Sequence, residues 1–299
     1  MSEKLDKKYY DPRALAKIGS LEIAARLVVE GFVTGLHRSP FKGASVEFAE
    51  HRQYVPGDEI RHLDWKVYGR NDRFYIKEFE EETNLRAYLL VDASGSMEYG
   101  ASGIRKFDYA CYLAAALTYL MLQQQDSAGL VLFDRQIRRY LAPRSTPTHF
   151  RTMLSILGGS KPGGETALGV ILHDLAERIK RRGLIILISD LFDDPRRLIS
   201  GLQHFRHKKH EVIVLQVLDP DETSFPFKNW TLFEGLEDQR RVLTEPQLIR
   251  QQYMEEVNKF MEELKRGCHL RRIDLCQLHT NTPYDTALAR YLARRAGRG

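Results

Sequence analysis

The pattern of apolar and polar positions changes at about residue 86, and the longer part of the chain follows that point. Short apolar runs there alternate with amphipathic stretches of helical length. The runs that predict strands are AYLLV (87–91), AGLVLF (128–133), LIILIS (184–189) and EVIVLQV (211–217). The first, third and fourth are continuous apolar runs, which are typical of parallel strands covered on both faces.

Amphipathic segments between and after these strands predict helices. They cover residues 106–125, 147–157, 167–182, 195–208, 247–267 and 283–295. Asp194 before Pro195 marks one helix start, with the acid as the N-cap residue. Residues 134–143 predict an edge strand, and residues 270–276 predict a final strand.

This alternation of strands and helices predicts βαβ units and a doubly wound, mostly parallel α/β sheet. Right-handed crossovers then place functional sites at the carboxyl ends of the strands. We assign residues 86–299 to this domain and residues 1–85 to a separate N-terminal region. In that region, residues 21–33 predict a helix, and the strand-like RFYIKEF with the turn signals VPGDE and GRND predicts a β-rich extension.

Composition narrows the class of protein. Of the 299 residues, 43% are apolar and 28% are charged, as in ordinary soluble globular proteins. No apolar run approaches the roughly 20 residues that span a bilayer, and the polar N-terminus lacks the apolar core of a signal peptide. We therefore expect no membrane span and a cytoplasmic location. Cys111, Cys268 and Cys276 form no CxxC pair and predict no disulfide framework.

The net charge of +5 is mild, because 45 basic residues are opposed by 40 acidic ones. Short basic clusters occur at IKRRG, FRHKKH and ARRAGRG. They stand near predicted helix ends, where cations suit the helix dipole. A nucleic-acid-binding surface would instead combine a continuous basic face with aromatic residues, so we expect no nucleic-acid partner. Binding through these clusters would weaken steeply with salt and ignore chelators.

Polar residues follow the segments that reach one edge of the predicted sheet. Asp92, Ser94 and Ser96 follow the first strand, Asp190 follows the third, and Thr166 stands in the loop GGSKPGGETALG before a helix. Singly, each has an ordinary explanation: a strand-end acid, a turn former, or, for Thr166, the N-cap of the next helix. Together they predict one site with two carboxylates and three hydroxyls.

Oxygen ligands with few carboxylates suit a hard cation, Mg²⁺ or Mn²⁺. Two aspartates only neutralise such an ion, and hydroxyls add no charge. The ion can therefore bind a further anion, and a partner's carboxylate could fill an open position.

At these residues the sequence resembles a known family. VDASGSM, with Thr166 in GGETALG and Asp190 in LISD, resembles the metal-ion-dependent adhesion site of von Willebrand factor A domains. The resemblance implies an A-type fold over about residues 86–220. It also implies that Ser94, Ser96 and Thr166 are hydroxyl ligands, and that Asp92 and Asp190 bind the metal directly or through water.

The preceding segment resembles the bacterial family called domain of unknown function 58. Its pattern R-x-Y-x-x-GD-x-x-R-x-x-DW is carried by Arg52, Tyr54, Gly57, Asp58, Arg61, Asp64 and Trp65. The alternating charges and Trp65, which can stack on a guanidinium, favour an ionic network that fastens the extension to the A-type domain. A second recognition surface is the alternative.

Different classes of function remain open. The first is a metal-dependent protein-interaction module without enzymatic activity, whose partner donates an acidic residue to the metal. The family resemblance implies action beside a MoxR-type AAA+ ATPase in assembly or maturation of client proteins. The alternative is a metal-dependent hydrolase or phosphatase that uses a strand-end acid. Against it, Ser94 stands where an aspartyl-phosphate phosphatase has a second aspartate, and the chain has no Walker A, GxGxxG or GxSxG motif.

Overall fold

The computed structural model describes residues 46–55, 65–71, 74–81, 85–101, 103–238 and 240–296. The chain divides into two compact units, one formed by residues 32–84 and one that contains residues 85–299. The helix expected over residues 21–33 lies outside the described residues.

A six-stranded sheet forms the centre of the larger unit. Its strands are β3 (Arg86–Asp92), β4 (Ser127–Phe133), β5 (Ile137–Arg144), β6 (Leu184–Ser189), β7 (Glu211–Leu218) and β10 (Asp274–His279). They lie in the order β10-β7-β6-β3-β4-β5, and each pair is parallel except β4 with β5. Numbered within the sheet, this is the doubly wound order 3-2-1-4-5-6. The predicted fold class is confirmed.

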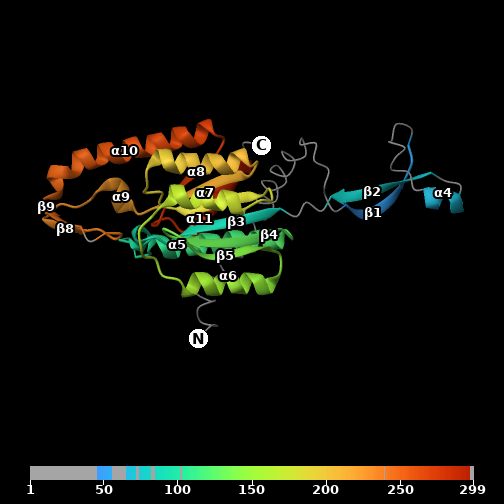
Figure 1. The fold of residues 1–299 in the computed structure, drawn as a ribbon, viewed down its shortest axis with the longest axis horizontal. Helices are drawn as coiled ribbons and strands as arrows, with labels where there is room; N and C mark the ends of the chain where they lie inside the picture. The colour runs from blue at the N-terminus through green and yellow to red at the C-terminus, as the bar shows by residue number, and fades with distance from the viewer. Residues whose placement is uncertain are drawn as a thin grey trace. The chain divides into compact units, whose positions relative to one another are not determined.

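Helices cover both faces of this sheet (Figure 1). They are α5 (Lys106–Gln123), α6 (Pro147–Gly159), α7 (Leu168–Arg178), α8 (Pro195–His207), α10 (Pro246–Leu270) and α11 (Tyr284–Ala296). Figure 1 shows α7, α8 and α10 on one face and α5 and α6 on the other. Tyr88 and Leu90 of β3 belong to the buried cluster that includes side chains from α7, α8 and α10. Alternate residues of a strand face opposite sides of the sheet, so the buried side chains of Leu89 and Val91 pack on the other face.

Some boundaries differ from the prediction. The helix α10 continues through Leu270, so the final strand begins at Asp274 rather than at residue 270. The buried Cys268 and Ile273 anchor the two sides of this junction, and Arg272 between them has a left-handed φ of 54°. The helix α8 begins as predicted, with the Asp194 carboxylate accepting from the backbone N–H groups of Arg196 and Arg197.

Three short elements near the carboxyl edge were not predicted. They are the 3-10 helix Gly95–Glu98, the helix α9 (Pro220–Ser224) and the hairpin of β8 (Thr231–Glu234) with β9 (Arg241–Thr244). The hairpin strands have four residues each, and many of their side chains are exposed. They therefore carry little of the apolar periodicity from which strands are predicted.

The smaller unit contains β1 (Val46–Gln53), which pairs antiparallel with β2 (Tyr75–Glu81), and the helix α4 (Trp65–Asn71). The sequence predicted a turn at GRND (69–72). That prediction is wrong for residues 69–71, which form the last residues of α4. Tyr68 stacks on Phe74 with ring centroids 4.4 Å apart, and Trp65 meets Tyr68 edge-on. The predicted ionic network depends mostly on side chains outside the described set.

No described helix has the combination of length and apolar character that would carry it across a lipid bilayer.

Asp126 gives the larger unit a specific dependence of stability on pH. Burial raises the pKa of Asp126 to about 7, although its Oδ1 accepts a hydrogen bond from the Leu85 N–H. The other carboxyl oxygen is buried without a partner. The unfolded carboxyl has a pKa of about 4, so the folded protein holds the proton more tightly. This contribution is fully favourable below about pH 4 and is lost as the pH rises to about 7.

As the pH rises from about 4 to about 8, the unfolding free energy of the wild type should fall by about 2–4 kcal/mol more than that of Asp126→Asn, which has no carboxyl group to titrate. Urea denaturation over this pH range measures the difference. Parallel pH profiles for the two proteins would contradict the assignment.

Candidate functional site

The candidate site lies where the strand order reverses, between the carboxyl ends of β3 and β6. These strands pair in parallel with Val91 opposite Ile188, which brings Asp92 beside Ser189 and Asp190. Asp92 and Asp190 are both fully buried. In open α/β sheets, ligands bind at such a reversal, outside the carboxyl ends of the strands.

Asp92 is held by two hydrogen bonds. The Ser189 Oγ donates to its Oδ2 at 2.6 Å, and the Ser94 N–H donates to its Oδ1 at 2.9 Å. Burial, and secondarily the charge of Asp190, raises the pKa of Asp92 to about 7. Nearby positive charge would stabilise the ionised form of this carboxyl.

The two serines follow directly. Ser94 precedes the 3-10 helix Gly95–Glu98, and its hydroxyl lies 3.1 Å from that of Ser96. The alternate spacing seen in the sequence therefore places both hydroxyls on one side of the loop.

Thr166 reaches the site through a second loop, and two backbone hydrogen bonds join this loop to the first. The Gly163 N–H donates to the Ala93 carbonyl at 2.9 Å, and the Gly95 N–H donates to the Gly164 carbonyl at 2.8 Å. Gly164 has a φ of 81°, a conformation that glycine adopts readily. The alternative reading of Thr166 as a helix N-cap is wrong: Ala167 occupies the N-cap position of α7, and the Thr166 hydroxyl binds elsewhere.

Arg138 of β5 holds this second loop through hydrogen bonds to the loop backbone. Its guanidinium donates to the backbone carbonyls of Lys161 and Gly163 and forms an ion pair with Asp134 at 2.7 Å. The edge strand therefore contributes to the position of Thr166.

Lys106 and Glu237 are charged residues at the site that were not predicted from the sequence. The ammonium of Lys106, a fully buried residue at the start of α5, donates to Asp190 Oδ2 at 2.7 Å and also to Glu222. Burial opposes the charge on Lys106, but the two carboxylates outweigh it and raise its pKa. The second residue is Glu237, which accepts hydrogen bonds from Thr166 and Ser96. Lys106 stands at a helix start, and Glu237 stands in the loop of a hairpin that was not predicted, so no signal in the sequence marked either residue.

The donor set suits an octahedral divalent ion. Ligands about 2.1 Å from Mg²⁺ lie ~3 Å from their neighbours, which is close to the spacing of the Ser94 and Ser96 hydroxyls. The described residues contain no group of three His, Cys, Asp or Glu side chains placed to hold a metal. An ion at this edge would therefore depend on the hydroxyls of Ser94, Ser96 and Thr166 together with Asp92 and Asp190.

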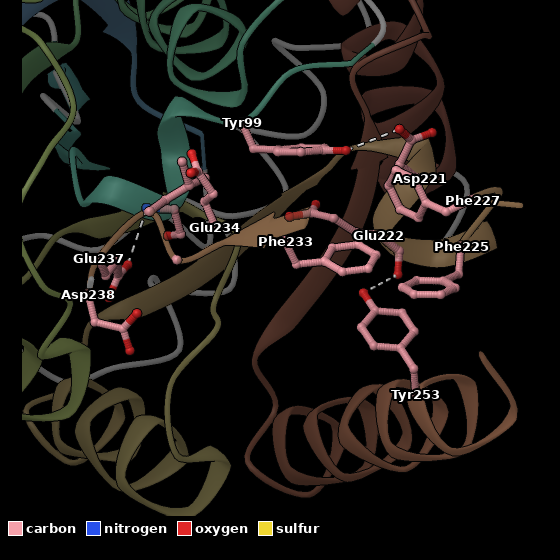
Figure 2. A pocket seen from close by; sticks show the side chains of 13 residues that line it. Tyr99, Asp221, Glu222, Phe225, Phe227, Phe233, Glu234, Glu237, Asp238 and Tyr253 are labelled. Atoms are coloured by element: carbon pink, nitrogen blue, oxygen red, sulfur yellow. Dashed lines mark hydrogen bonds between the residues drawn. The ribbon is translucent and has the colours of Figure 1, made fainter. Parts of the chain in front are cut away.

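A pocket of about 390 Å³ opens beside Ser96. Figure 2 shows its two kinds of lining: the rings of Phe225, Phe233 and Tyr253, and acidic side chains that include Asp221 and Glu237. The Tyr99 hydroxyl donates to Asp221 at 3.1 Å. The pocket combines apolar surface with negative charge next to the candidate metal ligands.

Comparison with known proteins gives matches at several levels. The family model described as "Protein of unknown function DUF58" matches residues 50–263. The uncharacterized protein Rv1480 of Mycobacterium tuberculosis is 29% identical over 224 residues, which cover 72% of this chain and 68% of that protein. The uncharacterized protein YeaD of Bacillus subtilis is 27% identical over 106 residues, or 36% of this chain and 24% of YeaD.

Solved structures also match. BatB from Bacteroides thetaiotaomicron has a TM-score of 0.47 and 18% identity, with 71% of this chain and 99% of BatB covered. The VWA domain of SpRpn10 has a TM-score of 0.37 and 11% identity, with 73% of this chain and 96% of that domain covered. Since the family model spans well over half of its residues, the chain belongs to the DUF58 family.

Proposed function

We propose that this protein is a metal-dependent protein-interaction module. The observation that carries the proposal is the convergence of Asp92, Ser94, Ser96, Thr166 and Asp190 at the reversal of strand order. The ion would be Mg²⁺ or Mn²⁺, held by hydroxyls and two carboxylates, and it would supply an electropositive centre for an acidic side chain of a partner.

The arrangement of charges supports binding rather than turnover. Both oxygens of Asp92 accept hydrogen bonds, which reduces the nucleophilicity of this carboxylate, while each oxygen keeps a second lone pair that a metal ion can use. Lys106 is engaged by two carboxylates and so is not free to act as a general acid. We therefore propose a module without catalytic activity.

We further propose that the module works beside a MoxR-type AAA+ ATPase in the assembly or maturation of client proteins. This part of the proposal is supported by the family resemblance. The ATPase would use ATP hydrolysis to remodel the client. The module would bind an acidic residue of the client or of the ATPase reversibly through the metal ion.

The test measures metal binding and partner capture separately. Calorimetry should detect one Mn²⁺ or Mg²⁺ site in the wild type, and Asp92→Ala should lose at least about tenfold in affinity. In pull-downs from native lysate, the captured partner should be lost on chelation and with Asp92→Ala. Capture that is unaffected by both changes would refute the proposal, and metal-dependent hydrolysis of a phosphate ester that Ser94→Ala abolishes would favour a phosphatase.

A further inference from the structure

The loop between β8 and β9 directs a carboxylate at the candidate metal ligands. Thr166 donates to Glu237 twice, from its N–H to Oε2 at 2.9 Å and from its hydroxyl to Oε1 at 2.7 Å. The Ser96 N–H donates to the same Oε1 at 3.3 Å. Figure 2 shows Glu237 with this hydrogen bond, while the neighbouring Asp238 points away from it. One side chain thus contacts both loops that carry hydroxyl donors.

The loop is closely fitted to the site. A Cβ on Gly95 would lie 2.2 Å from the Leu236 carbonyl oxygen, so a side chain there would force the loop to move. Glu237 is partly buried, whereas the nearby Glu234 and Asp238 are exposed. These exposed acids pair with Arg241 and Arg240, respectively. Glu237 is therefore the acid of this loop that is turned toward the site.

We propose that Glu237 is an internal ligand of the metal ion and occupies the position that a partner's carboxylate takes. This inference rests on the proposed function, because it assigns a regulator to the same site. Glu237 Oε1 lies 2.7 Å from the Thr166 hydroxyl, near the ~3 Å spacing of adjacent ligands around an octahedral ion. The carboxylate is thus placed beside a proposed ligand as a neighbouring ligand would be.

Because Glu237 belongs to the same chain as the metal ligands, a partner's carboxylate must compete with it for the metal ion. An intramolecular ligand competes at an effective concentration of about millimolar or higher, so a free carboxylate of weak affinity is excluded. A partner must add contacts beyond its acidic side chain in order to displace Glu237. The adjoining pocket, which Glu237 itself helps to line, offers surface for those contacts.

The experiment uses Mn²⁺ with the full chain and measures water-proton relaxation, which reports the number of water molecules on the bound ion. Removing one protein ligand admits one more water. The hydroxyls of Ser94, Ser96 and Thr166 together with Glu237 would take four of six positions, and Asp92 and Asp190 would bind through the two remaining waters. Glu237→Ala should therefore raise the relaxivity of bound Mn²⁺ about 1.5-fold, because the number of bound waters rises from two to three. Acetate should displace this added water at a concentration at least about tenfold lower than the wild type requires.

Glu234→Ala is the matched control, since it removes an exposed acid from the same hairpin and should behave as the wild type. Glu237→Gln keeps a hydrogen-bond acceptor and should fall between the wild type and Glu237→Ala in acetate sensitivity. Equal relaxivity and acetate response in Glu237→Ala and the wild type, with Mn²⁺ bound to both, would overturn the inference and leave the proposed function standing. Failure of the wild type to bind Mn²⁺ would overturn both.

Discussion

Lys106→Met is expected to lower the free energy of unfolding by about 3–5 kcal/mol, because it leaves buried carboxylates without their cation. Lys106 and Asp190 are both fully buried, and their ion pair joins the start of α5 to the end of β6. Methionine retains most of the aliphatic length and can still pack near the Phe192 ring, which lies 5.2 Å from the Lys106 ammonium. The loss is therefore mainly electrostatic.

Urea denaturation in the presence of a chelator measures this loss. The double variant Lys106→Met with Asp190→Asn should recover at least part of it, because the uncompensated charge is then removed. Lys208→Met is the matched control: Lys208 pairs with Glu177 at 2.7 Å on the surface, and such pairs contribute less than about 1 kcal/mol. An equally small loss for Lys106→Met would show that Asp190 is stabilised by other means.

Asp219→Ala should destabilise the protein by about 3–4 kcal/mol, because one buried carboxylate satisfies several donors. Asp219 follows β7 and is fully buried. Its oxygens accept hydrogen bonds from the Thr280 hydroxyl and from the backbone N–H groups of Ala101 and Asp221. Truncation removes the acceptor that these donors share and also the N-cap of α9.

Thermal and urea denaturation should rank the variants as Asp219→Ala below Asp219→Asn below the wild type, since asparagine keeps one acceptor oxygen. Asp174→Ala provides the comparison at the surface, where the carboxylate pairs with Arg178 within one helix. Its expected cost is below about 0.5 kcal/mol. If the two alanine variants were equally stable, the network around Asp219 would contribute nothing.

The sequence predicted the sheet because its central strands are buried on both faces. LIILIS, for example, is apolar along its whole length except for Ser189, and all six residues of β6 are buried. The same topology predicted that Asp92 and Asp190 would lie together, since both follow neighbouring parallel strands. Ser94 and Ser96 were assigned to the same site because they directly follow Asp92, and Thr166 because its loop leads into a helix at the same predicted edge of the sheet.

Lys106 and Glu237 could not be found in this way. Lys106 contacts Asp190 across 84 positions in sequence, and nothing near it distinguishes it from a lysine at an exposed helix start. Glu237 lies on a hairpin with little apolar periodicity and contacts Thr166 across 71 positions. Contacts of this kind depend on how separate segments pack, which local pattern does not encode.

The antiparallel edge strand β5 has a consequence for how molecules of this protein meet one another. An open sheet edge offers unpaired backbone groups to any strand that comes near, and this is a common start of aggregation. In β5, Pro143 supplies no backbone N–H, while Arg139 and Arg144 are exposed and bring positive charge to the edge. A second copy approaching this edge would meet like charges and an interrupted ladder of hydrogen bonds, so strand-to-strand polymerisation is disfavoured at high concentration.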